Sequence, residues 1–285
     1  MCGAILSFIF MAVAARSAQA ELSSLQLMAW RSVIGFFIVL ALLAFSARGF
    51  VQIIPTRPDL HIVRNVFHFA GQNLWLYGVM LIPLSQLVAL EFTMPIWVAL
   101  LAPLVLGEAL TRRGVFAAVL GFIGVLIVAQ PGVAPLNSGH LAAFVSAIAF
   151  ALNIMFTKKI MRYDSVLCVL FWMTTLQAAM GFLLGLWFGL AWPSLAVLPA
   201  VAVVGVAGLT AHLSLTHALA LAPASLVAPM EFLRLPLIAV VGMWLYGEAL
   251  DLLVFVGAAV IFASNLINMR AERGRSPPPP TGPVG

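Results

Sequence analysis

Charged residues are scarce in this chain of 285 residues. Only 8% of them are Asp, Glu, Lys or Arg, whereas 64% are hydrophobic. A water-soluble domain carries about 25% charged residues to cover its surface, so a soluble globule is excluded. Cysteine is almost absent as well. The two cysteines, Cys2 and Cys168, both lie in apolar runs, which excludes a scaffold held together by disulfides.

The motifs of the main alternative protein classes are also missing. The chain has no glycine-rich loop ending in Gly-Lys-Ser or Gly-Lys-Thr, so a P-loop ATP-driven pump is disfavoured. It has neither His-Glu-x-x-His nor Gly-x-Ser-x-Gly, so an intramembrane enzyme is disfavoured too. The sequence indicates no catalytic residue, no metal site and no cofactor. Its 14 Lys and Arg residues form no compact patch, and no nucleic-acid partner is expected.

Long apolar runs occupy most of the chain. No charged residue occurs between positions 165 and 230, and a membrane-spanning helix needs about 20 apolar residues. The runs predict an all-α polytopic membrane protein with ten transmembrane helices. The run 4–14 followed by Ala18-Gln19-Ala20 resembles a signal peptide, but without a basic leader it is interpreted as part of the first helix. The predicted helices are 3–20, 25–46, 60–81, 84–106, 113–130, 138–158, 165–190, 196–220, 224–247 and 251–270.

The basic residues predict the orientation of these helices. The connections near 81–84, 130–138, 190–196 and 247–251 contain no Lys or Arg. Because loops rich in Lys and Arg face the cytoplasm, both termini are predicted to be cytoplasmic, in the inner membrane of a bacterium. The proline-rich tail 271–285 is expected to be disordered on the same side. The eleven basic residues that lie between or after the apolar segments are Arg48, Arg57, Arg64, Arg112, Arg113, Lys158, Lys159, Arg162, Arg270, Arg273 and Arg275.

The chain repeats itself at an offset of 140 residues. Nine identities in one register predict two repeats of five helices each, 1–137 and 138–270. Five is odd, so the second repeat must cross the membrane in the opposite sense. Inverted repeats with a binding site near the midplane are typical of secondary transporters. The matching residues are Pro83, Ser85, Glu91, Phe92, Ala99, Gly107, Glu108, Ala109 and Leu110, paired with Pro223, Ser225, Glu231, Phe232, Ala239, Gly247, Glu248, Ala249 and Leu250.

Short motifs at helix ends and kinks also carry a resemblance to known proteins. They are Trp30-Arg31, Gly78, Pro83-Leu84-Ser85, Pro95, Leu106-Gly107-Glu108, Gly121, Gly124, the stretch 223–225 and Tyr246-Gly247-Glu248. With these motifs nearly the whole chain resembles the EamA type of ten-helix carriers in the drug/metabolite transporter superfamily, and most of all its bacterial amino-acid exporters. The resemblance implies the ten-helix fold of these carriers and a small-molecule substrate. The family also includes uptake systems for S-adenosylmethionine and carriers of nucleotide sugars.

These observations predict an alternating-access secondary transporter that exports small amino acids or related metabolites. The alternatives are uptake or exchange of another metabolite, such as S-adenosylmethionine or a nucleotide or sugar derivative, and, from other classes, a channel or an intramembrane enzyme. Proton coupling and facilitated diffusion both stay open. A monomer is expected, and a dimer would use the small residues Gly181, Gly185 and Gly189, which repeat every four positions.

Four charged residues fall well inside predicted spans, away from their ends: Arg31, Glu91, Glu231 and Arg234. Unpaired, they would cost roughly 10–14 kcal/mol on insertion scales, so they must be paired, hydrated or functional. Glu231 and Arg234 are three residues apart and are predicted to neutralise each other; Glu91 is then predicted to pair with Arg31. The four charges either lock helices together or line a cavity that binds the carboxylate and ammonium groups of an amino acid.

Further polar residues mark the expected cavity and its moving parts. His68, Gln72 and Trp75 form one stripe on a helix, and because polar atoms facing lipid would lack partners, the stripe is predicted to face protein or cavity. Asn153 and His212 are predicted to join it. For each one, a hydrogen bond between helices is the competing interpretation. Pro95, Pro103, Pro229 and Pro236 are candidate hinges, and Glu108 and Glu248 are candidate gates or helix caps.

Overall fold

The computed structural model describes residues 2–107, 112–130, 135–221 and 233–273, and within them the chain is helical without any strand. Each predicted span contains a described helix, although the span 224–247 is described only in its second half. The elements are α1 (Cys2–Ala18), α2 (Ser24–Phe45), η1 (Gly49–Ile53), α3 (Pro58–Leu81), α4 (Leu84–Glu91), α5 (Met94–Val105), α6 (Arg112–Ala129), α7 (Ser138–Ile160), α8 (Val166–Phe188), α9 (Leu198–Leu221), α11 (Arg234–Tyr246) and α12 (Leu252–Arg273).

The predicted helix 84–106 is broken into α4 and α5, which the sequence reading missed. Pro95 has no N–H and its ring excludes a helical carbonyl four residues earlier, so the helix ends at Glu91 and restarts at Met94 with Pro95 in its first turn. Side chains satisfy the carbonyls at the break. Thr93 Oγ1 donates to Leu90 O at 2.7 Å, and Asn265 Nδ2 of α12 donates to Phe92 O at 2.9 Å.

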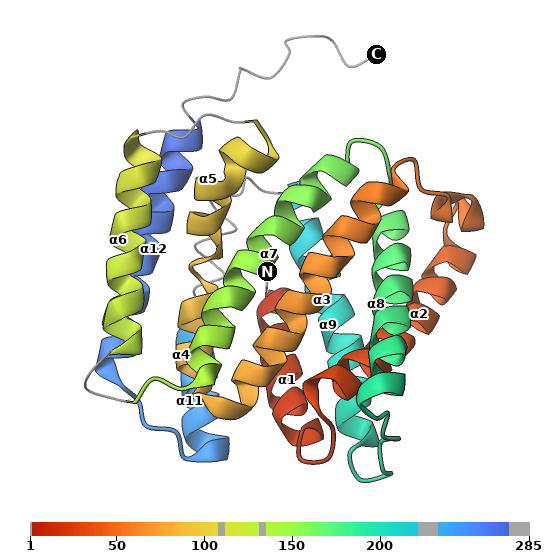
Figure 1. The fold of residues 1–285 in the computed structure, drawn as a ribbon, viewed down its shortest axis with the longest axis horizontal. Coiled ribbons are helices and arrows are strands. Elements are labelled where there is room, and N and C mark those ends of the chain that lie inside the picture. The colour runs from red at the N-terminus through yellow and green to blue at the C-terminus, as the bar shows by residue number, and fades with distance from the viewer. Residues whose placement is uncertain (1, 108–111, 131–134, 222–232, 274–285) are drawn as a thin grey trace.

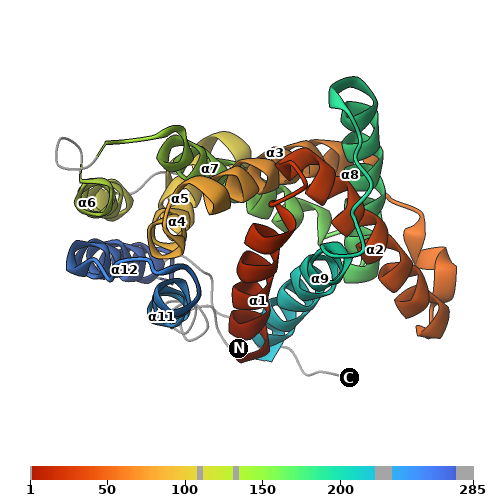
Figure 2. The same ribbon diagram turned by 90° about the horizontal axis from the view of Figure 1, so that it is seen from below.

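The helices pack in pairs that reproduce the internal repeat. The most extensive pairings are α3 with α7, α6 with α12, α1 with α9 and α2 with α8. If the spans are numbered one to ten, with α4 and α5 as one span, α3 and α7 are spans three and six. Exchanging the two halves converts this pair into spans eight and one, which are α9 and α1. Figures 1 and 2 show these pairs side by side from two directions, with α6 and α12 at one end of the molecule and α2 and α8 at the other.

Equivalent glycines of the two halves share an unusual backbone conformation. Gly107 has φ +73° and Gly247 has φ +66°, a left-handed region that glycine enters at little cost. Gly247 ends α11 there, with its N–H bonded to the carbonyls of Gly242 and Met243. The left-handed turn directs the following Glu248 back towards the helix bundle. The two halves therefore agree in structure as well as in sequence.

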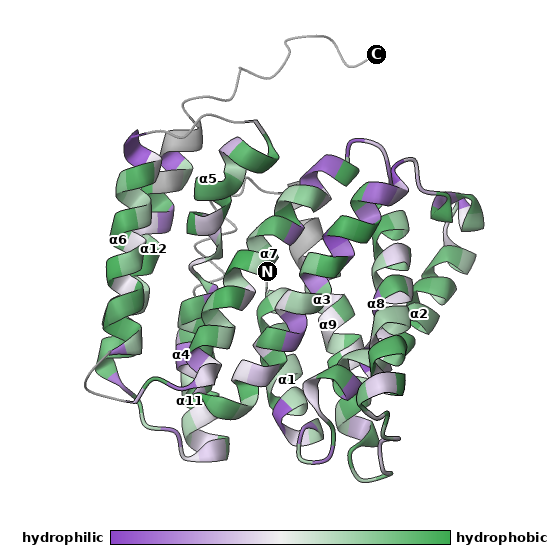
Figure 3. Ribbon diagram, viewed as in Figure 1, coloured by the Kyte–Doolittle hydropathy of each residue, from purple (hydrophilic) through white to green (hydrophobic). Residues whose placement is uncertain are grey.

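The outer surface is apolar, as a bilayer requires. Large side chains such as Phe45, Trp187, Leu195 and Trp244 are more than 80% exposed. Figure 3 shows helices coloured mainly as hydrophobic, with hydrophilic residues gathered at helix ends and along α3. Five helical segments in the described chain are long and apolar enough to cross a membrane. The 24-residue α3 is not among them because its inner face is polar.

Glycines allow α6 and α12 to touch through their backbones. A Cβ added to Gly124 would come 2.8 Å from Gly257 O, and one added to Gly257 would come 2.7 Å from Gly124 O. In the same way a Cβ on Gly181 would come 2.8 Å from Ala29 Cα, so Gly181 packs on α2 inside the molecule. The expected monomer stays a prediction.

Changing Gly124 to valine should destabilise the protein, because the added side chain meets backbone that cannot move aside. Overpacking of this kind costs about 1–3 kcal/mol. The measurement is the apparent Tm in detergent. Val119→Leu, which enlarges an exposed side chain of the same helix, is the matched control and should leave the Tm unchanged. An unchanged Tm for Gly124→Val would mean that α6 and α12 are not in close contact.

Candidate transport site

One face of α3 carries a continuous polar stripe. We define the α3 stripe as His61, Arg64, Asn65, His68, Gln72 and Trp75, each of which is at most 5% exposed. These positions are three or four residues apart and therefore lie on one side of the helix. The predicted stripe of His68, Gln72 and Trp75 is thus buried inside the protein, and the structure extends it by nearly two turns.

Arg31 of α2 reaches the middle of the α3 stripe. Its Nη1 donates to Gln72 Oε1, and the side chain is buried. Gly208 of α9 lies opposite, since a Cβ there would come 2.8 Å from Arg31 Nη2. No carboxylate of the described residues lies within ion-pair distance of Arg31.

The hydrogen bonds of His68 define its tautomer. Its Nδ1 accepts from the amide nitrogen of Gln177 on α8, whose orientation is supported by the nearby Asn65 Oδ1 at 3.5 Å. A neutral imidazole that accepts through Nδ1 carries its proton on Nε2. This buried Nε2–H has no partner among the described residues. The His68 ring lies 5.7 Å from the ring of His212 on α9, so the predicted meeting of His68 with His212 is found.

Arg64 corrects the sequence reading, which placed it with the basic residues of the loops. It is buried in α3, where Nε donates to Thr157 Oγ1 at 3.1 Å and Nη1 to Asn65 Oδ1 at 3.0 Å. The reason is that α3 begins at Pro58, so Arg64 lies almost two turns inside the helix and on its inner face. Neither contact is with an anion.

The intramembrane charges pair differently from the prediction. Glu91 Oε1 accepts from Arg234 Nη2 at 2.8 Å, and its Oε2 accepts from Trp75 Nε1 at 2.9 Å. The predicted pair of Glu91 with Arg31 is therefore wrong, because α4 packs against α11 whereas Arg31 faces Gln72. Arg234 also lies over the ring of Phe8, 4.8 Å from its centroid, and Phe8 in turn lies 6.0 Å from the His212 ring. The ion pair of Glu91 with Arg234 is thus connected through Phe8 to His212 and the α3 stripe.

One end of the α3 stripe is closed by Glu248. Its carboxylate forms an ion pair with Arg16 at the end of α1 and accepts from Leu84 N at 2.9 Å. Arg16 donates further to Ile82 O at 2.8 Å and to Val79 O. We call this group the Glu248 latch. Glu248 was a candidate gate or helix cap, and it caps α4 of the opposite repeat.

The other end is closed by Asp164, which follows α7. His61 Nε2–H donates to Asp164 Oδ2 at 2.9 Å, and Thr56 N donates to Oδ1 at 2.9 Å. We call this group the Asp164 latch. The ring nitrogen of His61, the carboxylate oxygen and the thiol of Cys168 lie within 4.8 Å of one another. Three such donors can bind a metal ion, but here His61 and Asp164 already satisfy each other.

The Asp164 latch should weaken in acid. Burial alone would raise the pKa of the Asp164 carboxyl, but hydrogen bonds from Thr56 and His61 outweigh it and hold the pKa below its ordinary value. Such a carboxyl stabilises the fold above its unfolded pKa of about 3.9, and the contribution is lost as pH falls through the lower folded pKa. The difference in apparent Tm between the natural protein and Asp164→Asn should be constant above about pH 5 and shrink below about pH 4. A difference that grows in acid would contradict this.

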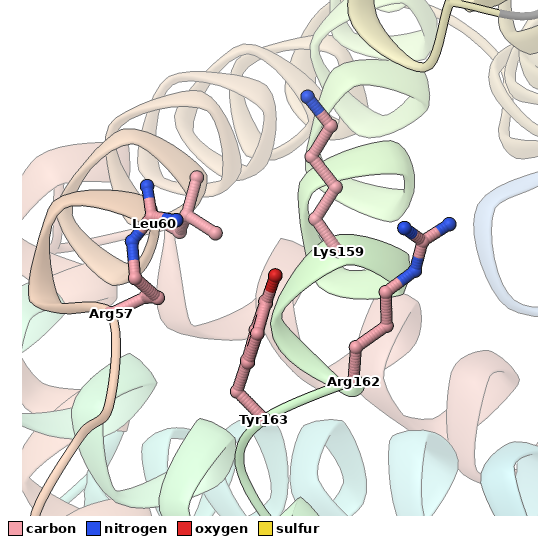
Figure 4. A pocket seen from close by; sticks show the side chains of 5 residues that line it. All are labelled: Arg57, Leu60, Lys159, Arg162 and Tyr163. Atoms are coloured by element: carbon pink, nitrogen blue, oxygen red, sulfur yellow. The ribbon is translucent and has the colours of Figure 1, made fainter.

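A basic pocket opens directly outside the Asp164 latch. Figure 4 shows it between the start of α3 and the end of α7. Its volume is about 220 Å³, and two of its lining residues, Leu60 and Tyr163, directly precede the latch residues His61 and Asp164. Arg57 is bound to Asp59, with N···O distances of 2.9 and 2.7 Å. The residues that line the pocket are Arg57, Leu60, Lys159, Arg162 and Tyr163.

The remaining predicted residues are placed as follows. Asn153 is buried on α7, and its Oδ1 has no partner among the described residues. Pro103 lies inside α5, and Pro236 in the first turn of α11. Their hinge roles stay predictions. Glu108, Pro229 and Glu231 lie outside the described residues, so the predicted pair of Glu231 with Arg234 stays a prediction too.

Besides Arg16 and Arg64, the sequence did not identify His61, Asn65, Gln177 and Asp164 as site residues. Gln177 is a buried amide side chain in a long apolar run that contains no charged residue. A polar side chain in such a run could have been recognised as a candidate from the sequence. His61 and Asn65 continue the spacing of His68 and Gln72 towards the start of α3, so extension of the stripe by the same period would have found them. Asp164 had no such signal, because it lies in a loop.

Comparison with known proteins gives one clear family match. The EamA-like transporter family matches residues 1–130 and, a second time, residues 137–270. The chain therefore carries two copies of the family's repeat, although the division at residue 137 stays a prediction. A solved crystal structure with a TM-score of 0.60 covers 96% of this chain and 96% of its own, at 19% sequence identity. At that identity the likeness shows the fold alone.

Two groups of named relatives are similar over most of the chain. An S-adenosylmethionine uptake transporter of Rickettsia prowazekii (strain Madrid E) is 26% identical, over 84% of this chain and 81% of its own. A riboflavin transporter of Rhizobium johnstonii (strain DSM 114642 / LMG 32736 / 3841) is 29% identical, over 86% of this chain and 81% of its own. Both relatives carry a small metabolite with a heteroaromatic ring.

Proposed function

Because the chain belongs to the EamA-like transporter family, we propose that it carries a small metabolite along the α3 stripe by alternating access. Family membership makes it a multi-pass membrane transporter rather than an enzyme. The observation that carries the proposal is a buried polar stripe with a latch at each end. Opening one latch while the other stays closed would expose the stripe to one side at a time, as inverted repeats permit.

Two substrate groups are consistent with this path. S-Adenosylmethionine is the first candidate because it combines an adenine ring with an amino-acid carboxylate that Arg31 could bind. Small amino acids, the substrates expected from the sequence, share that carboxylate and are the second candidate. Direction follows from the gradients that a symmetric carrier meets, so export and uptake are both compatible with the path. Proton coupling through Glu91 or the buried histidines is a separate proposal, and transport insensitive to an imposed pH gradient would remove it.

We further propose that the protein lies in the inner membrane of a bacterium with both termini in the cytoplasm. The basic pocket of Arg57, Lys159 and Arg162 then faces the cytoplasm, as the positive-inside rule requires. The Asp164 latch becomes the cytoplasmic gate and the Glu248 latch the outer gate. Tagging each terminus with a reporter that is active on one side only would test this orientation.

The test of transport is counterflow into proteoliposomes. Vesicles preloaded with unlabelled compound are diluted into the same labelled compound, with S-adenosylmethionine, riboflavin, methionine and threonine examined separately. The proposal predicts saturable accumulation of at least one of them above that in protein-free vesicles. Flux that rises linearly with concentration would indicate a channel. Absence of exchange for the whole panel, with folded protein, would remove these substrates from the proposal.

Alternating access predicts opposite effects of the two latches on Cys168. In a Cys2→Ser background, Asp164→Asn should raise the rate of thiol labelling of Cys168 roughly tenfold, as expected when about 1.4 kcal/mol of closing free energy is removed. Glu248→Ala should lower that rate, because opening the outer gate favours closure of the other. Equal increases from both changes would indicate general loosening rather than alternation.

A further inference from the structure

The centre of the α3 stripe contains an excess of positive charge. Arg31 and Arg64 are both buried, and neither has a carboxylate within ion-pair distance among the described residues. Arg31 contacts an amide, and Arg64 contacts an amide and a hydroxyl. Glu91, by contrast, is bound to Arg234. Buried guanidinium groups without an anion are costly, so the arrangement indicates an anion that comes from outside the chain.

The same region has more hydrogen-bond donors than acceptors. Arg31 offers five N–H groups, and the described residues accept from one nitrogen only. The buried Nε2–H of His68 has no acceptor there. Its Nδ1 accepts a hydrogen bond from Gln177. The proton of the neutral ring therefore stays on Nε2, because moving it to Nδ1 would break that bond. A group placed here must accept hydrogen bonds.

Gly208 indicates where such a group fits. It faces Arg31 without a side chain, whereas a Cβ would come 2.8 Å from Nη2 and 3.4 Å from Cζ. The guanidinium edge therefore lies against the backbone of Gly208, and Met11 Sδ lies beside it, 3.4 Å from the same Cβ position. If α9 moved slightly away from α2, that edge would become accessible. The hydrogen bond from Arg31 to Gln72 would stay intact, because Gln72 belongs to α3.

The basic pocket supplies an independent indication. Arg57, Lys159 and Arg162 surround the opening outside the Asp164 latch (Figure 4), and Arg64 lies one turn further along α3 than His61. A ligand entering here meets Lys159 and Arg162, beside Arg57, which is paired with Asp59. Once the Asp164 latch is open, the ligand meets Arg64 and then Arg31. Such an arrangement attracts the anionic group of a ligand.

We infer that the carrier binds an oxyanion of its substrate, a carboxylate or a phosphate, between Arg31 and the Nε2–H of His68, with Arg64 adding to the attracting field. The inference rests on the proposed function and narrows it to substrates that carry such a group. It favours S-adenosylmethionine, amino acids or a phosphorylated metabolite over an uncharged compound such as riboflavin.

Binding can be tested apart from transport. The apparent Tm of the purified protein is measured with citrate and with pyrophosphate against chloride at equal ionic strength. At least one of the two anions should raise the Tm of the natural protein, and neither should raise that of Arg31→Met or His68→Ala. Arg113→Gln, which changes an exposed arginine at the start of α6, away from the pocket and the α3 stripe, is the matched control and should keep the response. No stabilisation by either anion, or full stabilisation of Arg31→Met, would overturn the inference.

Transport is then compared within two matched pairs, each differing in one anionic group. S-Adenosylmethionine is paired with its decarboxylated form, and riboflavin 5′-phosphate with riboflavin. The member that carries the carboxylate or phosphate, in whichever pair is exchanged, should be preferred at least about tenfold, because buried donors would lack a partner in the other member. The two pairs distinguish carboxylate from phosphate. Equal exchange within a pair overturns the oxyanion site and leaves the carrier intact. Anion binding without exchange of any compound leaves the site intact and contradicts the proposed function for these substrates.

Discussion

Exchange should fall by about 30-fold or more when Arg31 is changed to methionine, since loss of one partner of a buried charged contact costs about 2–5 kcal/mol. The apparent Tm should stay unchanged or rise. Arg31 has no carboxylate partner among the described residues, and methionine fills similar space without a buried charge. Loss of function combined with retained or improved stability is typical of a residue kept for binding rather than for folding.

The measurements are initial counterflow rate against substrate concentration and apparent Tm in detergent. Arg31→Lys keeps the charge but loses the planar fork of donors, and should recover part of the exchange. Arg113→Gln, which changes an exposed arginine at the start of α6, is the control. A clear drop in Tm for Arg31→Met would instead assign Arg31 a structural role. The loss of exchange would then be no evidence that Arg31 binds the substrate.

Arg234→Met should have the opposite profile, with a large loss of stability. It leaves the carboxylate of Glu91 in the protein interior, where Trp75 Nε1–H is its remaining side-chain donor among the described residues. Breaking a buried ion pair costs about 3–5 kcal/mol, which lowers the Tm of a protein of this size by roughly 6 °C or more. The double variant Glu91→Gln with Arg234→Met should recover part of that loss, because Glu91 is then replaced by a neutral amide.

A double-mutant cycle on the apparent Tm measures this coupling directly. Arg234→Met, Glu91→Gln and the double variant are compared with the natural protein. Additive effects of the two single changes would show that Glu91 and Arg234 do not depend on each other. In that case the contact between α4 and α11 would rest on apolar packing alone.

Most of the fold was predictable because hydropathy and length determine membrane helices almost by themselves. The spans predicted at 25–46 and 138–158 match α2 and α7 within a few residues. The break between α4 and α5 was missed although Pro95 was identified. Proline in a membrane helix can kink it, end it or be accommodated. Which of these occurs depends on neighbours such as Asn265, which lies 173 positions from Phe92.

The site was predictable in part, for a different reason. Periodicity places His68, Gln72 and Trp75 on one face of α3, and the need to bury polar atoms turns that face inward. Periodicity says nothing about which residue of another helix each one meets. The partner of Glu91 depends on the packing of α4 against α11, and Arg31, which was left over once Arg234 was assigned to Glu231, was the wrong choice. Arg64 was missed because a basic residue near a loop resembles the many that only orient helices.

The three long-range ion pairs described here, Arg16 with Glu248, His61 with Asp164 and Glu91 with Arg234, each join the first repeat to the second. None of them is duplicated by the repeat. At the offset of 140 residues, Arg234 corresponds to Met94, Asp164 to Ser24 and Arg16 to Phe156. The repeat keeps the acidic residues, since Glu91 matches Glu231 and Glu108 matches Glu248, but it does not keep the basic and acidic partners named above. A half paired with a copy of itself would therefore lack these contacts, and each half is complete only with the other.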